Sequence, residues 1–413
     1  MLIFTFIYSL VLLLFSAWSY LYVDWHLELL QFSWYKNLQT ILWNFSLNQR
    51  VLSASFYVLI ILILYTLYIL FLVILGTSEA RTPESKRKGF WTSQNDGAGK
   101  THNINLKYTI LLLVLTISIL FFSHPALSHD IFNYIMSAKI VTFYHENPWM
   151  VMPIEFLKEP MLNFLHAGNK FVLYGPFWVL ITLIPSSLGQ NNFLLTFGLF
   201  KILMLAFYAG SAWLIYRINK EQKNAEAIQN LIFFAFNPLV LIETLSSSHN
   251  DIVMMFFVLL SFYLLMKKNF LSSIVYFLFS VAIKYASIIL LPLYLFVVYK
   301  INKKETIDWE KIFSWAAIFM FIVFLLSPLR EELYPWYLIW TLGLIAVTKN
   351  HQFFKVFLTA LSFGLLMRYV PFMLTYDWFG YTPLVKKIVT FAPCFLVTVG
   401  FWGIKYLRQK AGR

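Results

Sequence analysis

Long apolar runs, separated by short polar connections, limit the fold of this 413-residue chain more than any other feature. A helix that crosses a bilayer needs about 20 predominantly apolar residues, and in hydrocarbon only helices and closed barrels satisfy their own backbone groups. We therefore predict an all-α polytopic membrane protein with twelve spans, formed as a single domain over residues 1–413. The predicted spans are Leu2–Val23, Val51–Gly76, Tyr108–Phe122, Asn192–Arg217, Ile228–Leu245, Ile252–Met266, Phe270–Ile283, Tyr285–Tyr299, Ile312–Ser327, Trp336–Thr348, Phe353–Tyr369 and Ile388–Leu407.

The composition agrees with a membrane protein. Hydrophobic residues make up 60% of the chain and charged residues 12%, whereas a soluble domain is about half apolar and a quarter charged. The net charge of +13 does not indicate nucleic-acid binding, because surplus Lys and Arg usually lie in cytoplasmic loops and no basic soluble domain is present. Cys394 is the single cysteine, so no internal disulfide forms. Leu2–Val23 lacks a basic n-region and a small-residue cleavage site, and we expect it to be a retained first span.

The polar segment 77–107 sets the predicted orientation. It holds six Lys and Arg residues, which is the strongest indication in the chain of a cytoplasmic loop. Segment 123–174 then lies outside, and both termini are cytoplasmic. We expect Asp130–Tyr144 to be a helix along the membrane interface. Gly175–Leu188 is short and broken by Pro185, so we expect it to enter the membrane and return to the same side.

Costly polar side chains gather at the predicted external span ends, whereas the cytoplasmic side carries mainly Lys and Arg. Ionisable residues in or near spans are rare and commonly functional. The external set includes Asp130, Glu146, His249, Asn250, Asp251, Lys284 and Arg330. This one-sided distribution predicts a site for a polar substrate on the external face of the cell membrane.

Asp130 is open to two interpretations. A carboxylate close to the membrane boundary can be a general base that takes the proton of an acceptor hydroxyl, which needs hydrogen-bond reach and a pKa raised by partial burial. It can equally be an N-cap, because Ser128-His129-Asp130 precedes a helical stretch and Asp is a favoured capping residue. The residues alone leave both open.

The two other polar groups carry similar alternatives. The His249-Asn250-Asp251 sequence is either a turn with a helix cap or a polar segment that extends into the cavity and binds a phosphate or a sugar hydroxyl. Lys284 either extends to the headgroups or meets a buried anion, for which we expect a lipid phosphate. Arg330 and Arg368 are alternative phosphate ligands, although interfacial anchoring is the stronger expectation for Arg368.

Aromatic turns at Tyr174 and at Tyr334 to Trp336 are typical of the aromatic belt of membrane proteins, and could also stack on sugar rings. We expect no protein-bound metal, because the histidines lack HxxH or HExxH spacing and the carboxylates are scattered. We also expect no cofactor and no nucleotide donor, because no Gly-rich phosphate loop is present.

An ordered set of short motifs resembles the GT-C glycosyltransferases, in particular the bacterial polyprenol-phosphomannose-dependent α-1,6-mannosyltransferases. The set is HDIFNY (129–134), ENPW (146–149), YGPFW (174–178), NPLVLIETLSSSHND (237–251), AIKYASIILLP (282–292) and YPWYLIW (334–340). The resemblance covers about half of the chain. It implies a GT-C-like bundle and an inverting transferase with its site on the non-cytoplasmic face.

The resemblance also implies roles for individual residues. Asp130 matches the essential Asp of the first long external loop, Lys284 matches the lysine of the hairpin, and the HND turn is His249, Asn250 and Asp251. Related sequences often have Tyr-Arg-Tyr after the Asp, where this chain has Phe132-Asn133-Tyr134. A phosphate contact from that arginine would be missing here. Glu146 then belongs to the turn that shapes the cavity.

We therefore predict a membrane glycosyltransferase. It would move a sugar, mannose by the resemblance, from a polyprenyl-phosphate donor to a glycan or lipid-linked acceptor, with Asp130 as base. A transporter or flippase of a lipid-linked or polar solute is the alternative, and it predicts polar residues at mid-membrane and on both faces. A third interpretation is a scaffold subunit of an envelope-synthesis complex without chemistry of its own.

Overall fold

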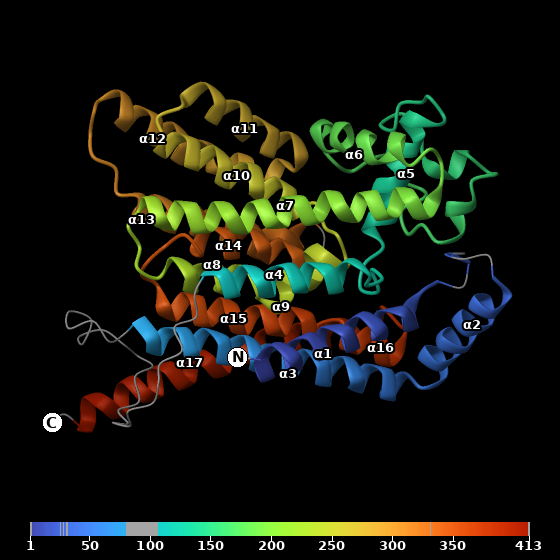
Figure 1. Ribbon diagram of the computed structural model, residues 1–413, viewed down its shortest axis with the longest axis horizontal. Coiled ribbons are helices and arrows are strands. Elements are labelled where there is room, and N and C mark those ends of the chain that lie inside the picture. The colour runs from blue at the N-terminus through green and yellow to red at the C-terminus, as the bar shows by residue number, and fades with distance from the viewer. Residues whose placement is uncertain are drawn as a thin grey trace.

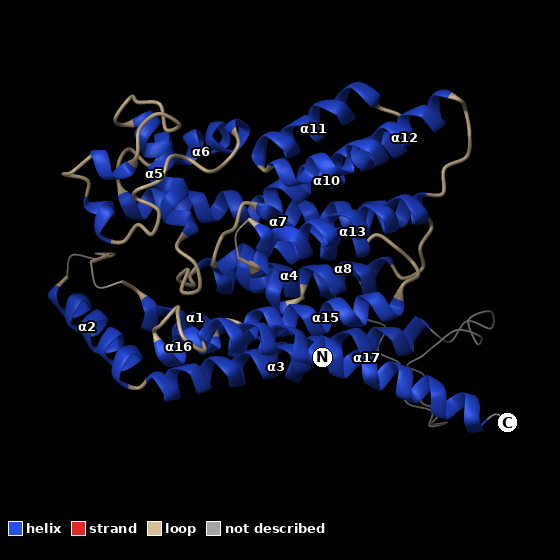
Figure 2. Ribbon diagram, turned by 180° about the vertical axis from the view of Figure 1, so that it is seen from behind, coloured by secondary structure: helices blue, strands red, loops and turns tan. Residues whose placement is uncertain are grey.

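The computed structural model describes residues 2–24, 26, 27, 29, 32–79, 106–330 and 332–411, and within these ranges it contains helices and loops but no strand (Figure 2). The predicted cytoplasmic loop 77–107 therefore lies, for residues 80–105, outside the described residues. The α-helices are α1 (Leu2–Ser19), α2 (Ser33–Asn48), α3 (Arg50–Glu79), α4 (Leu106–Phe121), α5 (Asp130–Thr142), α6 (Pro176–Leu188), α7 (Phe193–Glu221), α8 (Ala227–Ala235), α9 (Pro238–Leu241), α10 (Asp251–Met266), α11 (Phe270–Ile283), α12 (Leu291–Asn302), α13 (Trp309–Leu326), α14 (Leu338–Ile345), α15 (Gln352–Met367), α16 (Val370–Thr375) and α17 (Thr382–Ala411).

Every predicted span contains a helix, and the polytopic all-α architecture is confirmed. Within the described residues, seven helical segments are long and apolar enough to cross a bilayer, and a bent pair would make eight. Five further apolar helices have 10–17 residues each, which is less than the length that a straight crossing requires. The predicted count of twelve spans is therefore not confirmed.

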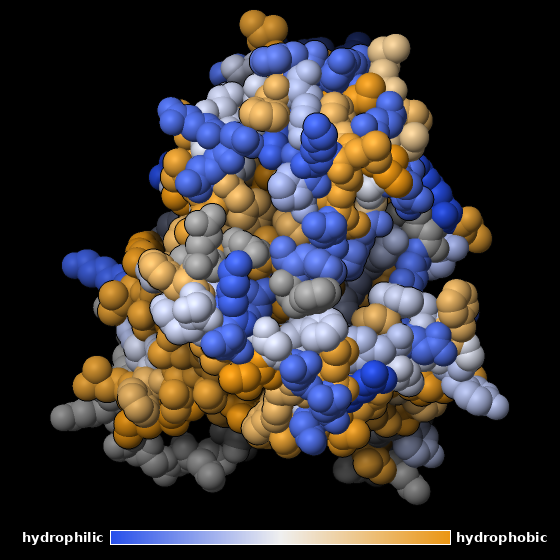
Figure 3. All heavy atoms as spheres, turned by 90° about the vertical axis from the view of Figure 1, so that its right-hand side faces the viewer, coloured by the Kyte–Doolittle hydropathy of each residue, from blue (hydrophilic) through white to orange (hydrophobic). Residues whose placement is uncertain are grey.

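The long helices run side by side along the longest axis of the molecule, so that the connections gather at its two ends (Figure 1). One end carries α2, α16 and the segment from α5 to α6. The other end carries the connection from α12 to α13 and the C-terminal end of α17. Figure 3 views the first end and shows hydrophilic side chains over its centre, flanked by hydrophobic ones. Among the described residues, the predicted external segment between α4 and α6 therefore lies at the first end, and the predicted cytoplasmic connection from α12 to α13 lies at the second.

Helix α5 confirms the predicted helix at Asp130, but it does not have the one-sided burial of a helix on a membrane surface. Eight of its 13 residues are buried, and they point in all directions around the helix axis. No residue of α5 is fully exposed. It packs against α6 and α7, so it is an internal helix and not a peripheral one.

The predicted span Ile228–Leu245 is broken, which is a correction to the expectation of a straight helix. Helices α8 and the following Pro238–Ser246 segment meet at 54°. Asn237 caps the second helix by accepting a hydrogen bond from the Leu239 amide at 3.0 Å, and Pro238 cannot donate to a continuing helix. The chain then forms a π-helical turn over Ile242–Ser246, a form that is frequent at functional sites.

Helix α6 begins where the chain passes very close to the end of α11. The Gly175 amide donates to the Ile283 carbonyl oxygen at 3.1 Å, and a Cβ atom at Gly175 would lie 2.2 Å from the Ala282 carbonyl oxygen. Only glycine fits such an approach. This contact joins the YGPFW segment to the lysine-containing hairpin. That α6 re-enters the membrane stays a prediction.

Candidate active site

A cavity of about 350 Å³ opens at the end of the molecule that carries α2, α5 and α16. It is formed by the start of α5, the loop before η7 (Pro335–Tyr337), and the region from α15 to α17. Its polar and aromatic walls include Asp24, Ser128, His129, Asp130, His166, Glu332, Tyr334, Trp336, Arg368, Tyr369, Tyr376, Trp378 and Lys386. Carboxyl, imidazole and cationic groups therefore face one space together with broad aromatic rings.

Asp130 is the first residue of α5, and it is not the N-cap. The capping position is His129, which makes no side-chain cap bond, while the Asp130 amide donates to the Ser128 hydroxyl at 3.3 Å. The carboxylate is 29% exposed and lies 3.4 Å from Nδ1 of His249. The capping interpretation of this carboxylate is thus not supported, and Asp130 remains available to a substrate in the cavity.

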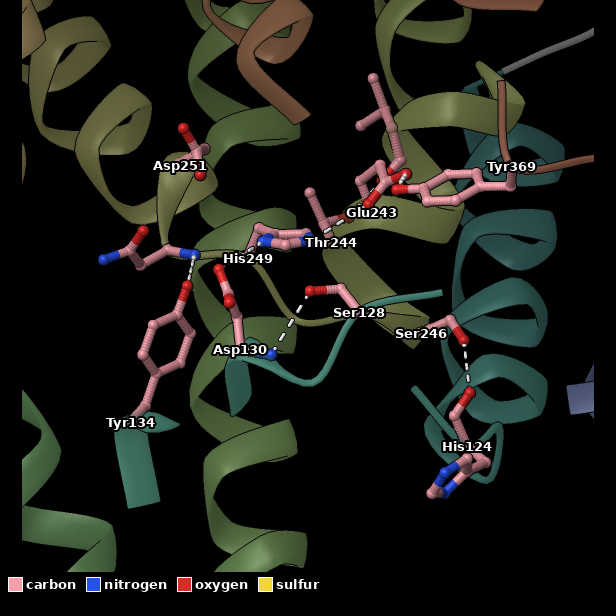
Figure 4. A network of polar contacts seen from close by, with 12 residues as sticks. His124, Ser128, Asp130, Tyr134, Glu243, Thr244, Ser246, His249, Asp251 and Tyr369 are labelled. Carbon is pink, nitrogen blue, oxygen red and sulfur yellow. Dashed lines mark hydrogen bonds and ion pairs between the residues drawn. The ribbon is translucent and has the colours of Figure 1, made fainter. Parts of the chain in front are cut away.

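His249 is fully buried between two carboxyl groups (Figure 4). Its Nε2 atom lies 3.1 Å from Glu243 Oε2, and the Tyr369 hydroxyl donates to Glu243 Oε1 at 2.9 Å. The imidazole stacks on Trp336 with ring centroids 3.7 Å apart. The π-helical turn projects Glu243 inward, so that both ring nitrogens of His249 meet an acid.

The charges of this arrangement reinforce one another. Burial lowers the pKa of His249, but its hydrogen bonds and charge interactions with Asp130 and Glu243 outweigh burial and raise this pKa to about 9. Burial raises the pKa of Asp130, but the hydrogen bond and charge of His249, together with the charge of Lys284, leave the pKa of Asp130 below its ordinary value. The expectation of a raised pKa at Asp130 is therefore wrong, because the neighbouring cations outweigh burial. At neutral pH a cationic imidazole thus holds an ionised Asp130.

Two cationic side chains also line the cavity. The Arg368 guanidinium lies 2.6 Å from Glu332 Oε1, and the Lys386 ammonium contacts the same oxygen. Both cationic side chains are only 8% exposed, whereas Glu332 is 41% exposed. The Lys386 ammonium also lies 4.8 Å from the centre of the Trp378 ring. Arginine and lysine in such a place can bind an anion in a polar substrate.

A family comparison gives the class of the protein. The family model described as alpha-(1->6)-mannopyranosyltransferase, N-terminal domain, matches residues 38–300, which is well over half of the chain. The chain belongs to this family. It is therefore a membrane mannosyltransferase, with a sugar donor and a glycan acceptor. No curated protein and no solved structure gives a significant match.

Asp251 and Lys284 of this mannosyltransferase lie behind the cavity and do not line it. The Lys284 ammonium lies 2.7 Å from Asp251 Oδ2, and Trp340 Nε1 donates to Asp251 Oδ1 at 2.6 Å. The predicted anion for Lys284 is present, but it is a carboxylate of the protein itself. The pair ties α10 to α11 and α14, and its direct part in substrate binding stays a prediction.

The side-chain amide of Asn250 has no hydrogen-bond partner among the described residues. The Asn250 backbone amide donates to the Tyr134 hydroxyl at 3.4 Å, as Figure 4 shows. The side-chain amide is buried, and the buried hydroxyls of Ser247 and Ser248 likewise have no partner among the described residues. A buried polar group without a partner is costly, and this turn is thus a place where water or substrate would be stabilising.

The remaining predicted site residues separate into two groups. Tyr334 and Trp336 line the cavity and stack on each other with centroids 4.5 Å apart. Tyr174 packs on Tyr134 at 4.8 Å, outside the cavity lining. Arg330 is exposed at the end of α13, and Glu146 is exposed in the turn after α5. Neither of these two contributes to the described wall of the cavity.

Sequence reasoning did not single out Tyr369 and Lys386. It counted Glu332 among the external polar residues and left Glu243 as either a ligand or a snorkelling or paired carboxylate. A carboxylate inside the apolar run 228–245 was the one available signal for Glu243. Arg368 was expected to be an interfacial anchor, but the structure places it in the cavity wall. Among the described residues, no group of three or more His, Cys, Asp or Glu side chains could hold a metal ion.

Proposed function

We propose that this mannosyltransferase moves mannose from a polyprenyl-phosphate donor to a hydroxyl of a glycan or lipid-linked acceptor, on the non-cytoplasmic face and with inversion. The observation that supports this proposal most is the partly exposed Asp130 carboxylate, held by buried His249 at the edge of the cavity. The GT-C-like motifs and the family membership agree with it.

Asp130 is the general base in this proposal. It accepts the proton of the acceptor hydroxyl while the hydroxyl oxygen attacks the anomeric carbon of mannose. The bond between that carbon and the phosphate oxygen breaks, and the polyprenyl phosphate leaves with the electron pair. A carboxylate with a lowered pKa stays ionised throughout the neutral range and can accept the proton, but it is a weaker base than one whose pKa is near the working pH.

His249 positions the base. A cationic imidazole carries an N–H group on each ring nitrogen, and one nitrogen lies 3.4 Å from Asp130 while the other lies 3.1 Å from Glu243. Stacking on Trp336 prevents the ring from turning. The carboxylate is therefore already oriented before substrate binds, which lowers the cost of reaching the transition state.

Arg368 and Lys386 bind the donor phosphate in this proposal. They are the Arg and Lys side chains among the described residues that line the cavity with Asp130. Glu332 now occupies their donors, and its greater exposure lets a phosphate displace it. Tyr334 and Trp336 offer ring faces on which a sugar can stack.

The proposed compartment follows from the two ends of the molecule. The cavity lies at the end opposite the α12–α13 connection and the C-terminal end of α17. Those segments are basic, and basic segments usually face the cytoplasm. We place the cavity on the external side for this reason.

The decisive experiment uses membranes that contain the full chain, radiolabelled polyprenyl-phosphate-mannose, and analysis of labelled lipid and glycan. Transfer to a glycan is expected, and it should persist in EDTA because the proposal assigns no step to a metal. Movement of the lipid-linked sugar across vesicles without any glycosidic product would replace the enzyme with the transporter alternative.

A further inference from the structure

A second and larger cavity, of about 810 Å³, lies at the same end of the molecule. It is enclosed by α5, the segment from Glu159 to Phe164, the end of α6 and the start of α7. Its volume is within the range of about 300–1,000 Å³ that is common for ligand pockets. None of its lining residues belongs to the cavity that contains Asp130.

The two cavities share a thin wall. His129 lines the first cavity, and its Nδ1 atom lies 3.3 Å from the carbonyl oxygen of Phe164, which lines the second. Asp24 lines the first cavity and lies 3.0 Å from the ring of His26, which lines the second. Residues in direct contact therefore separate the two cavities, which adjoin each other at this end of the molecule.

The chemistry of the second cavity fits a neutral molecule with many hydroxyl groups. The Lys139 ammonium is paired at 2.9 Å with the buried Glu159 carboxylate, which also accepts from the Tyr144 hydroxyl at 2.6 Å. Lys139 is the one Lys or Arg side chain among the described lining residues. Because its charge is already balanced, the cavity has no strong preference for a phosphate.

Further donors and acceptors cover the rest of the wall. The hydroxyls of Thr142 and Ser186 lie 2.7 Å apart, and the side chains of Asn163 and Asn191 also line the cavity. Hydroxyls and amides can donate and accept with sugar hydroxyls. The ring of Phe164 adds an apolar surface for the C–H face of a sugar.

We infer that this second cavity binds the sugars of the acceptor glycan that precede the sugar attacked at Asp130. The inference rests on the proposed function and adds a subsite to it. The first cavity holds the reacting groups and two cations, and the second holds uncharged sugars. An acceptor with several sugars would then bind more tightly than one with a single sugar.

The test compares octyl α-mannoside with an octyl α-1,6-mannotetraoside as acceptors, using full-length protein in membranes and polyprenyl-phosphate-mannose. The wild type should have a KM for the tetraoside lower by about tenfold, which corresponds to one or two additional hydrogen bonds. Ser187 lines the cavity and is exposed, so S187W would fill the space. In S187W the ratio of the two KM values should fall to near one, and N163W should act in the same way.

L188W is the matched control, because Leu188 is 60% exposed on the next residue of α6 and does not line the cavity. It should keep the wild-type ratio. Equal KM values for the two acceptors in the wild type, or an unchanged ratio in both S187W and N163W, would overturn the inference while transfer itself upholds the proposed function. A higher KM for the donor in S187W, with an unchanged ratio, would assign the cavity to the donor lipid. Transfer to neither acceptor by the wild type would overturn both proposals.

Discussion

Two buried polar networks, one at each end of the molecule, differ in how completely their groups are paired. In the network far from the cavity, the Asn219 oxygen accepts from Asn224 at 2.7 Å and from Asn230 at 2.8 Å. The Lys355 ammonium donates to Asn230 at 2.8 Å and to the Thr348 carbonyl oxygen at 2.9 Å. These side chains join α7, α8 and α15, and their polar groups are satisfied within the protein.

The network beside the cavity is different. It carries the buried His249 between two acids, and it leaves the Asn250 amide and the Ser247 and Ser248 hydroxyls without partners among the described residues. Satisfied networks stabilise one packing arrangement, whereas an unsatisfied buried group calls for a specific explanation. Under the proposed function, the first network stabilises the fold, and the second has buried polar groups that a substrate or water would satisfy.

The largest expected effect comes from removing the proposed base. D130N should insert and fold, but its kcat should fall by about 10²–10⁴-fold, which is the usual contribution of general base catalysis. The rate of mannose transfer from radiolabelled polyprenyl-phosphate-mannose measures this kcat. E146Q removes an exposed carboxylate after the same helix and should keep wild-type activity. Full activity in D130N would end the assignment of Asp130 as base.

The next effect concerns the cationic wall. R368Q should raise the KM for the donor by about 10–100-fold, because a charge-assisted hydrogen bond to phosphate contributes about 1.5–3 kcal/mol. The KM for the acceptor should change little. R330Q tests the phosphate ligand that the sequence suggested, and it should leave the donor KM unchanged because Arg330 does not line the cavity. A raised donor KM in R330Q, together with an unchanged donor KM in R368Q, would instead assign the phosphate site to Arg330.

The charge on His249 predicts a pH dependence. Its pKa is raised to about 9, so the ion pairs are fully present below the ordinary value of about 6.5 and are lost as the pH rises through about 9. A neutral imidazole can donate to one carboxylate only, and kcat/KM should therefore fall above pH 9. E243Q removes one of the two acids that raise this pKa, and the fall should move to lower pH. A pH profile that is identical in the wild type and E243Q would contradict this role of Glu243.

The smallest expected effect on catalysis comes from the network far from the cavity. N219A removes the acceptor of the buried Asn224 amide and one of the two acceptors of the Asn230 amide, and it should lower the free energy of unfolding by about 1–3 kcal/mol. The apparent Tm in detergent measures this loss. The kcat of the folded protein should stay at the wild-type value. A fall in kcat without a fall in Tm would show that the two networks are coupled and not separate.

Several elements could be predicted closely from the sequence, because apolar periodicity and flanking polar residues act locally. Phe270–Ile283 was predicted with the bounds that the structure has, and α5 begins at the predicted Asp130. The break in Ile228–Leu245 was not predicted, although Asn237-Pro238 is a local signal for it. An apolar run of this length is predicted to be one span unless the residue before the proline is taken as the end of a helix.

The composition of the cavity could be predicted only in part. Asp130, His249, Tyr334 and Trp336 were identified correctly as neighbours at one end of the protein. Lys284 was assigned to a phosphate, but it is paired with Asp251. A cation in the sequence attracts an anion, and the sequence does not state whether that anion belongs to the protein or to a substrate.

The sequence by itself determined that this chain is a polytopic helical membrane protein of the alpha-(1->6)-mannopyranosyltransferase family, and that Asp130 is the carboxylate to test first. Only the tertiary structure showed that His249 lies next to Asp130 and that Arg368 and Lys386 line the same cavity as Asp130. It also showed the second polar cavity beside the first. The physical reason is that apolar length and motif order are local properties of the chain. The partners of a charged side chain depend instead on how distant helices pack.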